Sequence, residues 1–171
     1  MNRTLKAMFV LLCFLLISSP SIAGQFRVVR VMDGNTIKVA VDHMEATVRL
    51  VGIDAPELER EKNEPGQPYG RKATKYLASL VSKKTITIKE YGSDRSGRIL
   101  GVVFINGTNA NLEMVKAGLA EVYRGRHARY FNPKIYQDAE AEAKKANRGM
   151  WSLGDKYISP QEWRKRHRKD M

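Results

Sequence analysis

The chain has 171 residues, carries 30 Lys and Arg against 18 Asp and Glu, and contains a single cysteine, Cys13. This length suits one ordinary domain, and one cysteine excludes a fold held together by internal disulfides. A formal net charge of +12 indicates an acidic partner, with nucleic acid first and other anionic surfaces second. The alternative is a basic soluble protein without such a partner.

The first 23 residues are typical of a secretory signal peptide rather than of folded structure. Arg3 and Lys6 stand at the start of an apolar run, Ala7 to Ile17, that is too short to span a bilayer. The small residues of Ser21-Ile22-Ala23 predict cleavage after Ala23. We therefore expect a secreted or periplasmic protein without membrane attachment in its mature form.

Three strands are predicted at the start of the mature chain. Gln25 to Met32 and Thr36 to Val41 contain β-forming residues, and the turn signal Asp33-Gly34 separates them. A second turn at Asp42-His43-Met44-Glu45 leads into a third strand, which contains Arg49. The pattern indicates a meander of three consecutive strands.

The remaining elements follow a polar loop from Glu57 to Gln67. We predict a helix over Tyr69 to Val81, strands over Thr85 to Lys89 and Ile99 to Ile105, a short helix capped by Asn109 or Asn111 and ending near Lys116, and a helix from Pro133 to about Asn147. Trp151 is expected to pack as core on the barrel or on a helix.

This order of elements predicts an α+β fold that is mainly β, a five-stranded OB-fold barrel with three helices. We see no second domain. From Pro160 the chain ends in the basic run Arg164-Lys165-Arg166-His167-Arg168-Lys169. We expect this tail to be disordered or a frayed helix that adds nonspecific charge.

The stretch from Arg49 to Glu57 is the candidate for chemistry. Arg49 offers a planar set of donors that suits phosphate oxygens, Asp54 is a hard oxygen ligand for Ca²⁺ or Mg²⁺, and Glu57 could take a proton from water. Because their spacing is odd, Arg49 and Asp54 would lie on opposite faces of a regular strand. They can share a site only if the strand bends, and Gly52 is the expected place. The alternative is a strand end with solvated charges.

Together these motifs resemble the staphylococcal-type thermonuclease family, and the resemblance spans Val28 to Ser152. The residues that carry it are Asp33-Gly34-Asn35-Thr36, Arg49-Leu50-Val51-Gly52-Ile53-Asp54-Ala55-Pro56-Glu57, Asp94-Arg95-Ser96-Gly97-Arg98, Gly118-Leu119-Ala120 and Ala139-Glu140-Ala141-Glu142-Ala143-Lys144-Lys145. The resemblance implies an OB-fold endonuclease that uses Ca²⁺ to hydrolyse phosphodiester bonds in DNA and RNA. It divides the chain into a signal peptide (1–23), a nuclease domain (24–153) and a basic tail (154–171).

The resemblance also implies the catalytic roles. Arg49 and Arg98 match two arginines that clamp the phosphate, and Glu57 matches the general base. A cation and two arginine side chains aimed at the phosphoryl oxygens would stabilise the negative charge that builds there during attack.

The same resemblance implies the metal ligands. Asp54 and the backbone carbonyl of Ala55 match calcium ligands, and Asp33 matches an acidic residue beside the metal. Asn35 stands where the family has a second aspartate ligand, so it can still coordinate calcium but brings no formal charge. Ala55 stands where the family usually has threonine, which matters little for a backbone ligand.

Two other functions compete with this nuclease. An OB-fold module that is catalytically weak or inactive and only binds nucleic acid would need basic residues but not Glu57, and the neutral Asn35 favours it. An adhesin for acidic polymers would rest on charge and export alone. For the nuclease we expect a monomer acting on DNA and RNA, with single-stranded or frayed substrate preferred.

Overall fold

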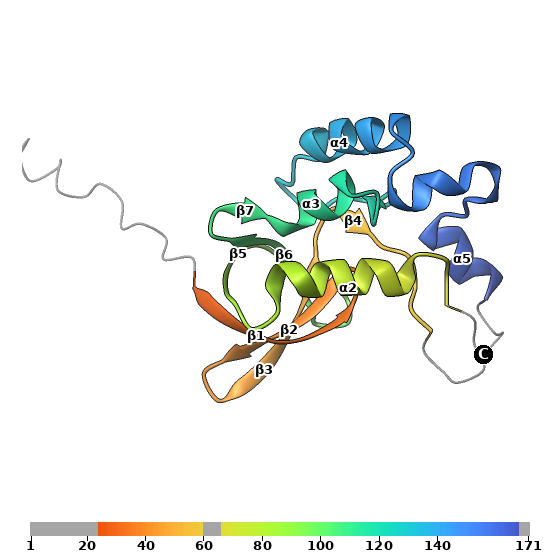
Figure 1. Ribbon diagram of the computed structural model, residues 1–171. Coiled ribbons are helices and arrows are strands. Elements are labelled where there is room, and N and C mark those ends of the chain that lie inside the picture. The colour runs from red at the N-terminus through yellow and green to blue at the C-terminus, as the bar shows by residue number, and fades with distance from the viewer. Residues whose placement is uncertain (1–23, 60–65, 168–171) are drawn as a thin grey trace, which may run out of the picture.

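The computed structural model describes residues 24–59 and 66–167 (Figure 1). The predicted signal peptide therefore lies outside the described residues. Among the described helices, none combines the length and apolar character that crossing a membrane requires.

Five strands form the barrel that the sequence predicts. They are β1 (Gln25–Asp33), β2 (Thr36–Val41), β3 (Met44–Leu50), β5 (Thr85–Ser93) and β6 (Ile99–Ile105). Neighbouring strands pair in the order β3-β2-β1-β5-β6, and β3 also pairs with β6, which closes the sheet on itself. The predicted OB-fold barrel is confirmed.

The closing contact between β3 and β6 is parallel, whereas the other barrel pairs are antiparallel. Its register pairs Arg49 with Leu100. Arg98 lies just before β6, so closure brings the two predicted arginines to neighbouring parts of the barrel. Two short strands, β4 (Ile53–Asp54) and β8 (Glu121–Val122), pair beside the barrel, and β7 (Thr108–Asn109) pairs antiparallel with the end of β6.

Three helices follow the prediction closely. They are α2 (Gly70–Val81), α3 (Ala110–Lys116) and α4 (Lys134–Lys145). Helix α2 lies across the barrel in Figure 1 and buries Ala73, Leu77 and Val81. Asn109 is the cap of α3, and its side chain accepts a hydrogen bond from the Leu112 amide at 3.0 Å.

The described residues contain two further helices, so the prediction of three helices was too low. A 3₁₀ helix, η1, covers Gly149–Lys156, and α5 covers Pro160–Arg166. Both are too short to show an apolar period. Local signals were nevertheless present, because Ser159 caps α5 by accepting from the Glu162 amide at 3.1 Å and Pro160 occupies its first turn. Trp151 of η1 packs against Ala143 of α4 in a small separate cluster, as predicted for a core residue.

A buried asparagine fixes the chain where β3 ends. Asn111 of α3 is fully buried, and its side-chain amide donates to the carbonyls of Val51 (3.0 Å) and Gly101 (3.1 Å). Its carbonyl oxygen accepts from the Val103 amide at 3.0 Å. Because a buried polar group is stabilising only when paired, this network holds β3 and β6 in one arrangement.

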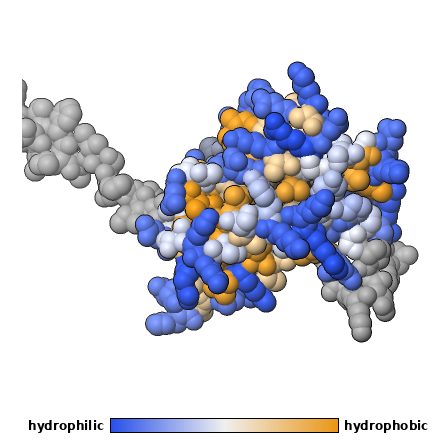
Figure 2. Space-filling view, viewed as in Figure 1, coloured by the Kyte–Doolittle hydropathy of each residue, from blue (hydrophilic) through white to orange (hydrophobic). Residues whose placement is uncertain are grey.

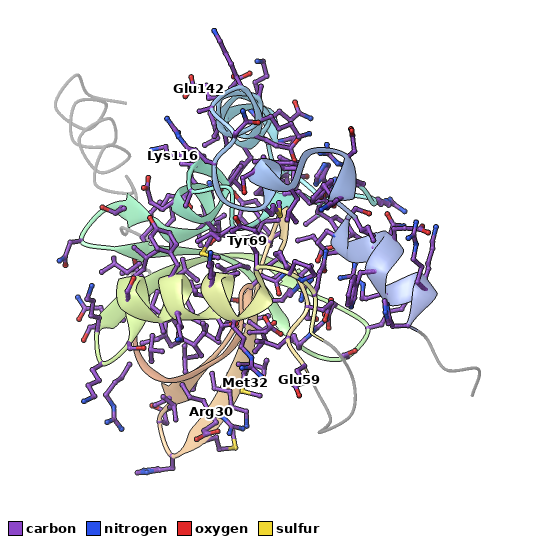
Figure 3. All side chains as sticks on the ribbon, turned by 45° about the vertical axis from the view of Figure 1, so that its right-hand side comes forward. Arg30, Met32, Glu59, Tyr69, Lys116 and Glu142 are labelled. Carbon is purple, nitrogen blue, oxygen red and sulfur yellow. The ribbon has the colours of Figure 1, made fainter. Side chains whose placement is uncertain are left out.

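The visible surface is mostly hydrophilic. Apolar residues form small separate areas between polar ones (Figure 2). Charged side chains such as Arg30, Glu59, Lys116 and Glu142 project outward from the ribbon (Figure 3). Acidic and basic side chains thus both project from the surface, and a functional site must be identified from a cavity rather than from charge alone.

Candidate active site

A sharp bend at Gly52 brings Arg49 and Asp54 together. Gly52 has φ +80°, and a Cβ there would lie 2.0 Å from the ring of Phe131, so only glycine suits this position. The bend reverses the strand alternation, and Arg49 Nη2 lies 2.9 Å from Asp54 Oδ1. The two residues share a site, as the bend at Gly52 predicts.

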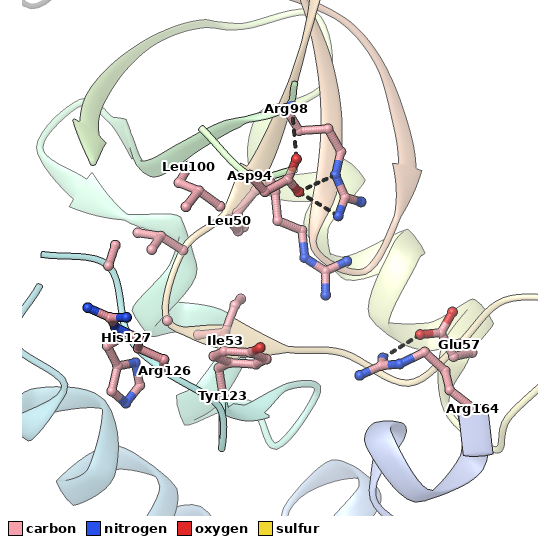
Figure 4. Close-up of a pocket in the computed structure, with 14 residues that line it drawn as sticks. Leu50, Ile53, Glu57, Asp94, Arg98, Leu100, Tyr123, Arg126, His127 and Arg164 are labelled. Atoms are coloured by element: carbon pink, nitrogen blue, oxygen red, sulfur yellow. Dashed lines mark hydrogen bonds and ion pairs between the residues drawn. The ribbon is translucent and has the colours of Figure 1, made fainter. Parts of the chain in front are cut away.

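This site opens on a cavity of about 420 Å³ beside the barrel (Figure 4). Four arginines from separate parts of the chain line it: Arg49, Arg98, Arg126 and Arg164. Glu57 lies at the same cavity, below and to the right of Arg98 in the view of Figure 4. A cavity that combines several guanidinium groups with a carboxylate suits a phosphate-bearing ligand.

Arg98 is held by a tight turn. Its Nε donates to Asp94 Oδ2 at 2.7 Å, and its backbone amide donates to Asp94 Oδ1 at 3.0 Å (Figure 4). Burial alone would raise the pKa of Asp94, but the hydrogen bonds and charge of Arg98 outweigh burial and hold it below its ordinary value. Asp94 was not singled out as a site residue, although its motif was. It positions Arg98.

The turn from Asp33 to Thr36 reaches the same region. Asp33 Oδ1 accepts from the Asn35 amide at 2.9 Å, and Asn35 Nδ2 lies 3.5 Å from Asp54 Oδ1. A Cβ on Gly34 would lie 2.7 Å from Ala55 Cβ, so glycine allows this close approach. Asn35 and Asp54 are each only 2% exposed. Asn35 and Asp54 therefore meet in a buried setting, while Asp33 caps the turn beneath them.

Glu57 is positioned through its backbone by Gln67, a residue of the predicted polar loop that no local signal marks as part of the site. The Glu57 amide donates to Gln67 Oε1 at 3.1 Å, and the Gln67 amide donates to the Glu57 carbonyl at 2.9 Å. Gln67 is buried, and its Nε2 also donates to the Ile158 carbonyl at 2.7 Å. Gln67 thus connects Glu57 to the segment before α5.

Arg164 of α5 enters the site, which corrects the expectation that the tail adds only nonspecific charge. Its Nη2 lies 2.6 Å from Asp54 Oδ2, and its Nη1 lies 3.1 Å from Asp54 Oδ1. Its Nη1 also lies 2.6 Å from Glu57 Oε1 (Figure 4). Burial opposes the charge of Arg164, but the hydrogen bonds and charges of both carboxylates outweigh burial and raise its pKa. A basic run predicts solvated charge, and only tertiary structure shows that this arginine turns inward.

The oxygen donors of the site suit a hard cation. In the described part of the chain, no three His, Cys, Asp or Glu side chains gather closely enough to hold a metal by themselves. Asp54 and Glu57 are nevertheless bridged by one cationic group, the Arg164 guanidinium. The Asn35 side-chain amide lies beside Asp54 in space, and Ala55, with its backbone carbonyl, follows Asp54 in the chain. These donors fit Ca²⁺ or Mg²⁺ that takes its other ligands from water and substrate.

Comparisons with known proteins point to one family. A family model described as staphylococcal nuclease homologue matches residues 47–153. A protein of Escherichia coli named "Uncharacterized endonuclease" is 42% identical over 144 residues, which cover 84% of this chain and 85% of that protein. A Shigella flexneri protein named "Micrococcal nuclease" is 36% identical, covering 88% of this chain and 87% of that protein. A Haemophilus influenzae protein, also named "Uncharacterized endonuclease", is 34% identical, covering 99% and 90%.

Proposed function

The chain belongs to the family of staphylococcal nuclease homologues, and on that premise we propose that it is an exported, calcium-dependent endonuclease acting on DNA and RNA. The named endonuclease and micrococcal nuclease relatives make it a nuclease that hydrolyses phosphodiester bonds, and nucleases of this family are generally metal-dependent. The calcium ion, both substrates and export are the proposed parts.

One observation carries the proposal: Arg49, Arg98 and Glu57 line a single cavity, and Arg49 contacts the buried Asp54. Attack on a phosphodiester builds negative charge on the phosphoryl oxygens. Guanidinium groups that the fold already holds in place stabilise that charge without having to reorganise. Such preorganised electrostatic stabilisation is usually the largest single contribution to an enzyme's rate enhancement. In this assignment Arg49 and Arg98 bind the phosphate.

The other residues hold the metal and the nucleophile. Asp54, Asn35 and the Ala55 carbonyl would bind calcium, with Asp33 fixing the turn that carries Asn35. A bound divalent cation supplies charge stabilisation and a more acidic water. Glu57 takes the proton from the attacking water, and Gln67 holds the backbone from which Glu57 reaches the cavity.

The principal rival is a binding module without catalysis. Its support is the neutral Asn35, since a site with one fewer charged ligand binds calcium less tightly. Against it stands Glu57, which lines the cavity among arginines where a module that only binds polyanions would gain nothing from a carboxylate. We therefore favour the enzyme.

The sequence and the cavity support the proposed setting and substrate form. The signal-like residues 1–23 support release outside the cytoplasm, as a secreted or periplasmic monomer without membrane attachment. A cavity of about 420 Å³ is in the range of small-ligand sites and suits one strand, or a frayed duplex end, rather than an intact duplex.

The test is incubation of the chain lacking residues 1–23 with labelled single-stranded DNA or RNA, in calcium or in a chelator. The proposal expects internal cleavage of both polymers in calcium and none in the chelator. Salt-sensitive binding with no cleavage under any metal condition would reject the enzyme and support the binding module.

A further inference from the structure

We propose that Arg164 is a tethered cation that competes with the divalent metal for Asp54 and Glu57, so that helix α5 must release these carboxylates before the metal binds. This inference rests on the proposed function, because it concerns the same metal. It gives the C-terminal helix a regulatory role that its short basic sequence does not indicate.

The contacts leave little capacity for a second cation. Arg164 donates to both oxygens of Asp54 and to Glu57 Oε1, and Arg49 donates to Asp54 Oδ1 as well. Asp54 is 2% exposed, so water can satisfy little of its carboxylate. A metal ion would need these oxygens, and it would be repelled by a guanidinium that already contacts them. Metal and Arg164 are therefore alternatives at this position.

Helix α5 contributes little to the buried core. Within it only Pro160, at the first turn, is buried, and the residues that follow are half-buried or exposed. Trp163 is half-buried and lines a small pocket with Met150 and Leu153, and the carboxylate contacts of Arg164 are the polar attachment of the helix to the site. Breaking the Arg164 contacts exposes charged groups to water, which solvates them well.

The segment before α5 is anchored independently. The Tyr157 hydroxyl donates to Glu121 Oε2 at 2.5 Å, and the Ile158 carbonyl accepts from Gln67. Tyr157 also packs on Trp151, with ring centroids 4.6 Å apart. These anchors keep α5 close after release, so Arg164 returns when the metal leaves. Only molecules in which Arg164 has left the carboxylates can bind the metal. The apparent metal affinity is therefore the intrinsic affinity multiplied by the fraction of such molecules.

The same helix provides a matched control. Arg166 lies two residues beyond Arg164, is exposed, and pairs with Glu162 of its own helix at 3.1 Å. Replacing Arg166 by Gln removes the same charge from the same helix but leaves the carboxylate contacts intact. A general effect of net charge on calcium affinity would appear in both variants, whereas competition appears only at Arg164.

The first experiment is calorimetric titration of the chain lacking residues 1–23 with Ca²⁺ alone, for the wild type, Arg164→Gln and Arg166→Gln. We expect Arg164→Gln to bind calcium roughly 10- to 100-fold more tightly, as relief from a closed state requires, and Arg166→Gln to match the wild type. Equal calcium affinity of Arg164→Gln and wild type would overturn the inference, as would equal tightening in both variants.

The second experiment needs no variant. Hydrogen exchange of the wild type is measured with and without saturating Ca²⁺, and we expect the amides of Trp163 and His167, bonded within α5, to exchange about tenfold faster or more when calcium is bound. Unchanged protection of α5 in calcium-bound protein would overturn the inference while leaving the proposed nuclease intact. Failure of every protein to bind calcium would instead overturn both.

Discussion

Replacing Asn35 by Asp tests the metal site at the position where this chain departs from the family it resembles. Asn35 Nδ2 lies 3.5 Å from Asp54 Oδ1, and both residues are 2% exposed. The variant therefore places a second carboxylate against Asp54 in a site that water barely reaches. Its behaviour should depend strongly on whether a divalent cation is present.

The magnitude follows from that distance. Two unit charges 3.5 Å apart repel by about 5 kcal/mol at an effective dielectric constant of 20. Arg49 and Arg164 contact Asp54 and offset part of this repulsion, so we expect a loss of about 2 kcal/mol in the free energy of unfolding without metal. For a domain of this size that loss lowers Tm by about 4–8 °C. Calcium at 100 times its Kd returns about 2.7 kcal/mol.

The assay is thermal unfolding of wild type and Asn35→Asp in chelator and in calcium, with a calorimetric titration to measure Kd. We expect the variant to be less stable in chelator, to gain more from calcium than the wild type gains, and to bind calcium more tightly. Asn106→Asp, in an exposed turn, adds the same charge away from the site and should change neither result. If calcium stabilises Asn35→Asp and wild type equally, residue 35 is not a ligand and the reasoning is refuted.

Three further predictions concern catalysis and stability. Glu57→Gln should lower the rate of the chemical step by roughly 10²- to 10⁴-fold with substrate binding retained in single-turnover assays, and lost binding with normal turnover would exclude a general base. Arg49→Lys and Arg98→Lys keep the charge but lose the planar donor set, so each should lower kcat on the order of 10²-fold, whereas wild-type rates would reduce both to diffuse charge. Glu140→Gln should lower Tm at neutral pH, because Glu140 pairs with Arg124 at 2.6 Å. Burial would raise the pKa of Glu140, but its hydrogen bonds and the charge of Arg124 outweigh burial and hold that pKa below its ordinary value of 4.5. The stability that Glu140 contributes is therefore fully present above this ordinary pKa and is lost as the pH falls through the lowered one. A Tm difference between variant and wild type that persists in strong acid would contradict this.

Local sequence patterns were sufficient to predict most of the helices and strands of the fold. The predicted strands Thr36–Val41 and Ile99–Ile105 match β2 and β6, and the helix predicted from Tyr69 begins at Gly70. These segments alternate or repeat over several residues, and each has turn or cap residues at its ends, so local and tertiary preferences agree. The bend at Gly52 could also be predicted, because only a bend lets Arg49 and Asp54 meet.

The missing parts of the site depend on contacts between distant segments. Arg164 meets Asp54 across 110 residues, and nothing local distinguishes it from Lys165 and Arg166, which are exposed as a basic run predicts. Gln67 was one polar residue in a polar loop. Its two partners, the backbone of Glu57 and of Ile158, become visible only when the chain is folded.

The parallel pairing of β3 with β6 has a kinetic consequence. Arg49 faces Leu100 across this pair, and the two strands are separated in the chain by α2 and β5. Pairings between distant segments are slow to form, because the intervening chain must first be ordered. An intermediate that contains only the β1–β2–β3 meander already carries Arg49, with Asp54 and Glu57 following in the chain, yet Arg98 is still elsewhere. During refolding, cleavage activity should therefore recover when the barrel closes, rather than when the hairpins or α2 first appear. The recovery of substrate turnover would then report the rate of the last step of folding.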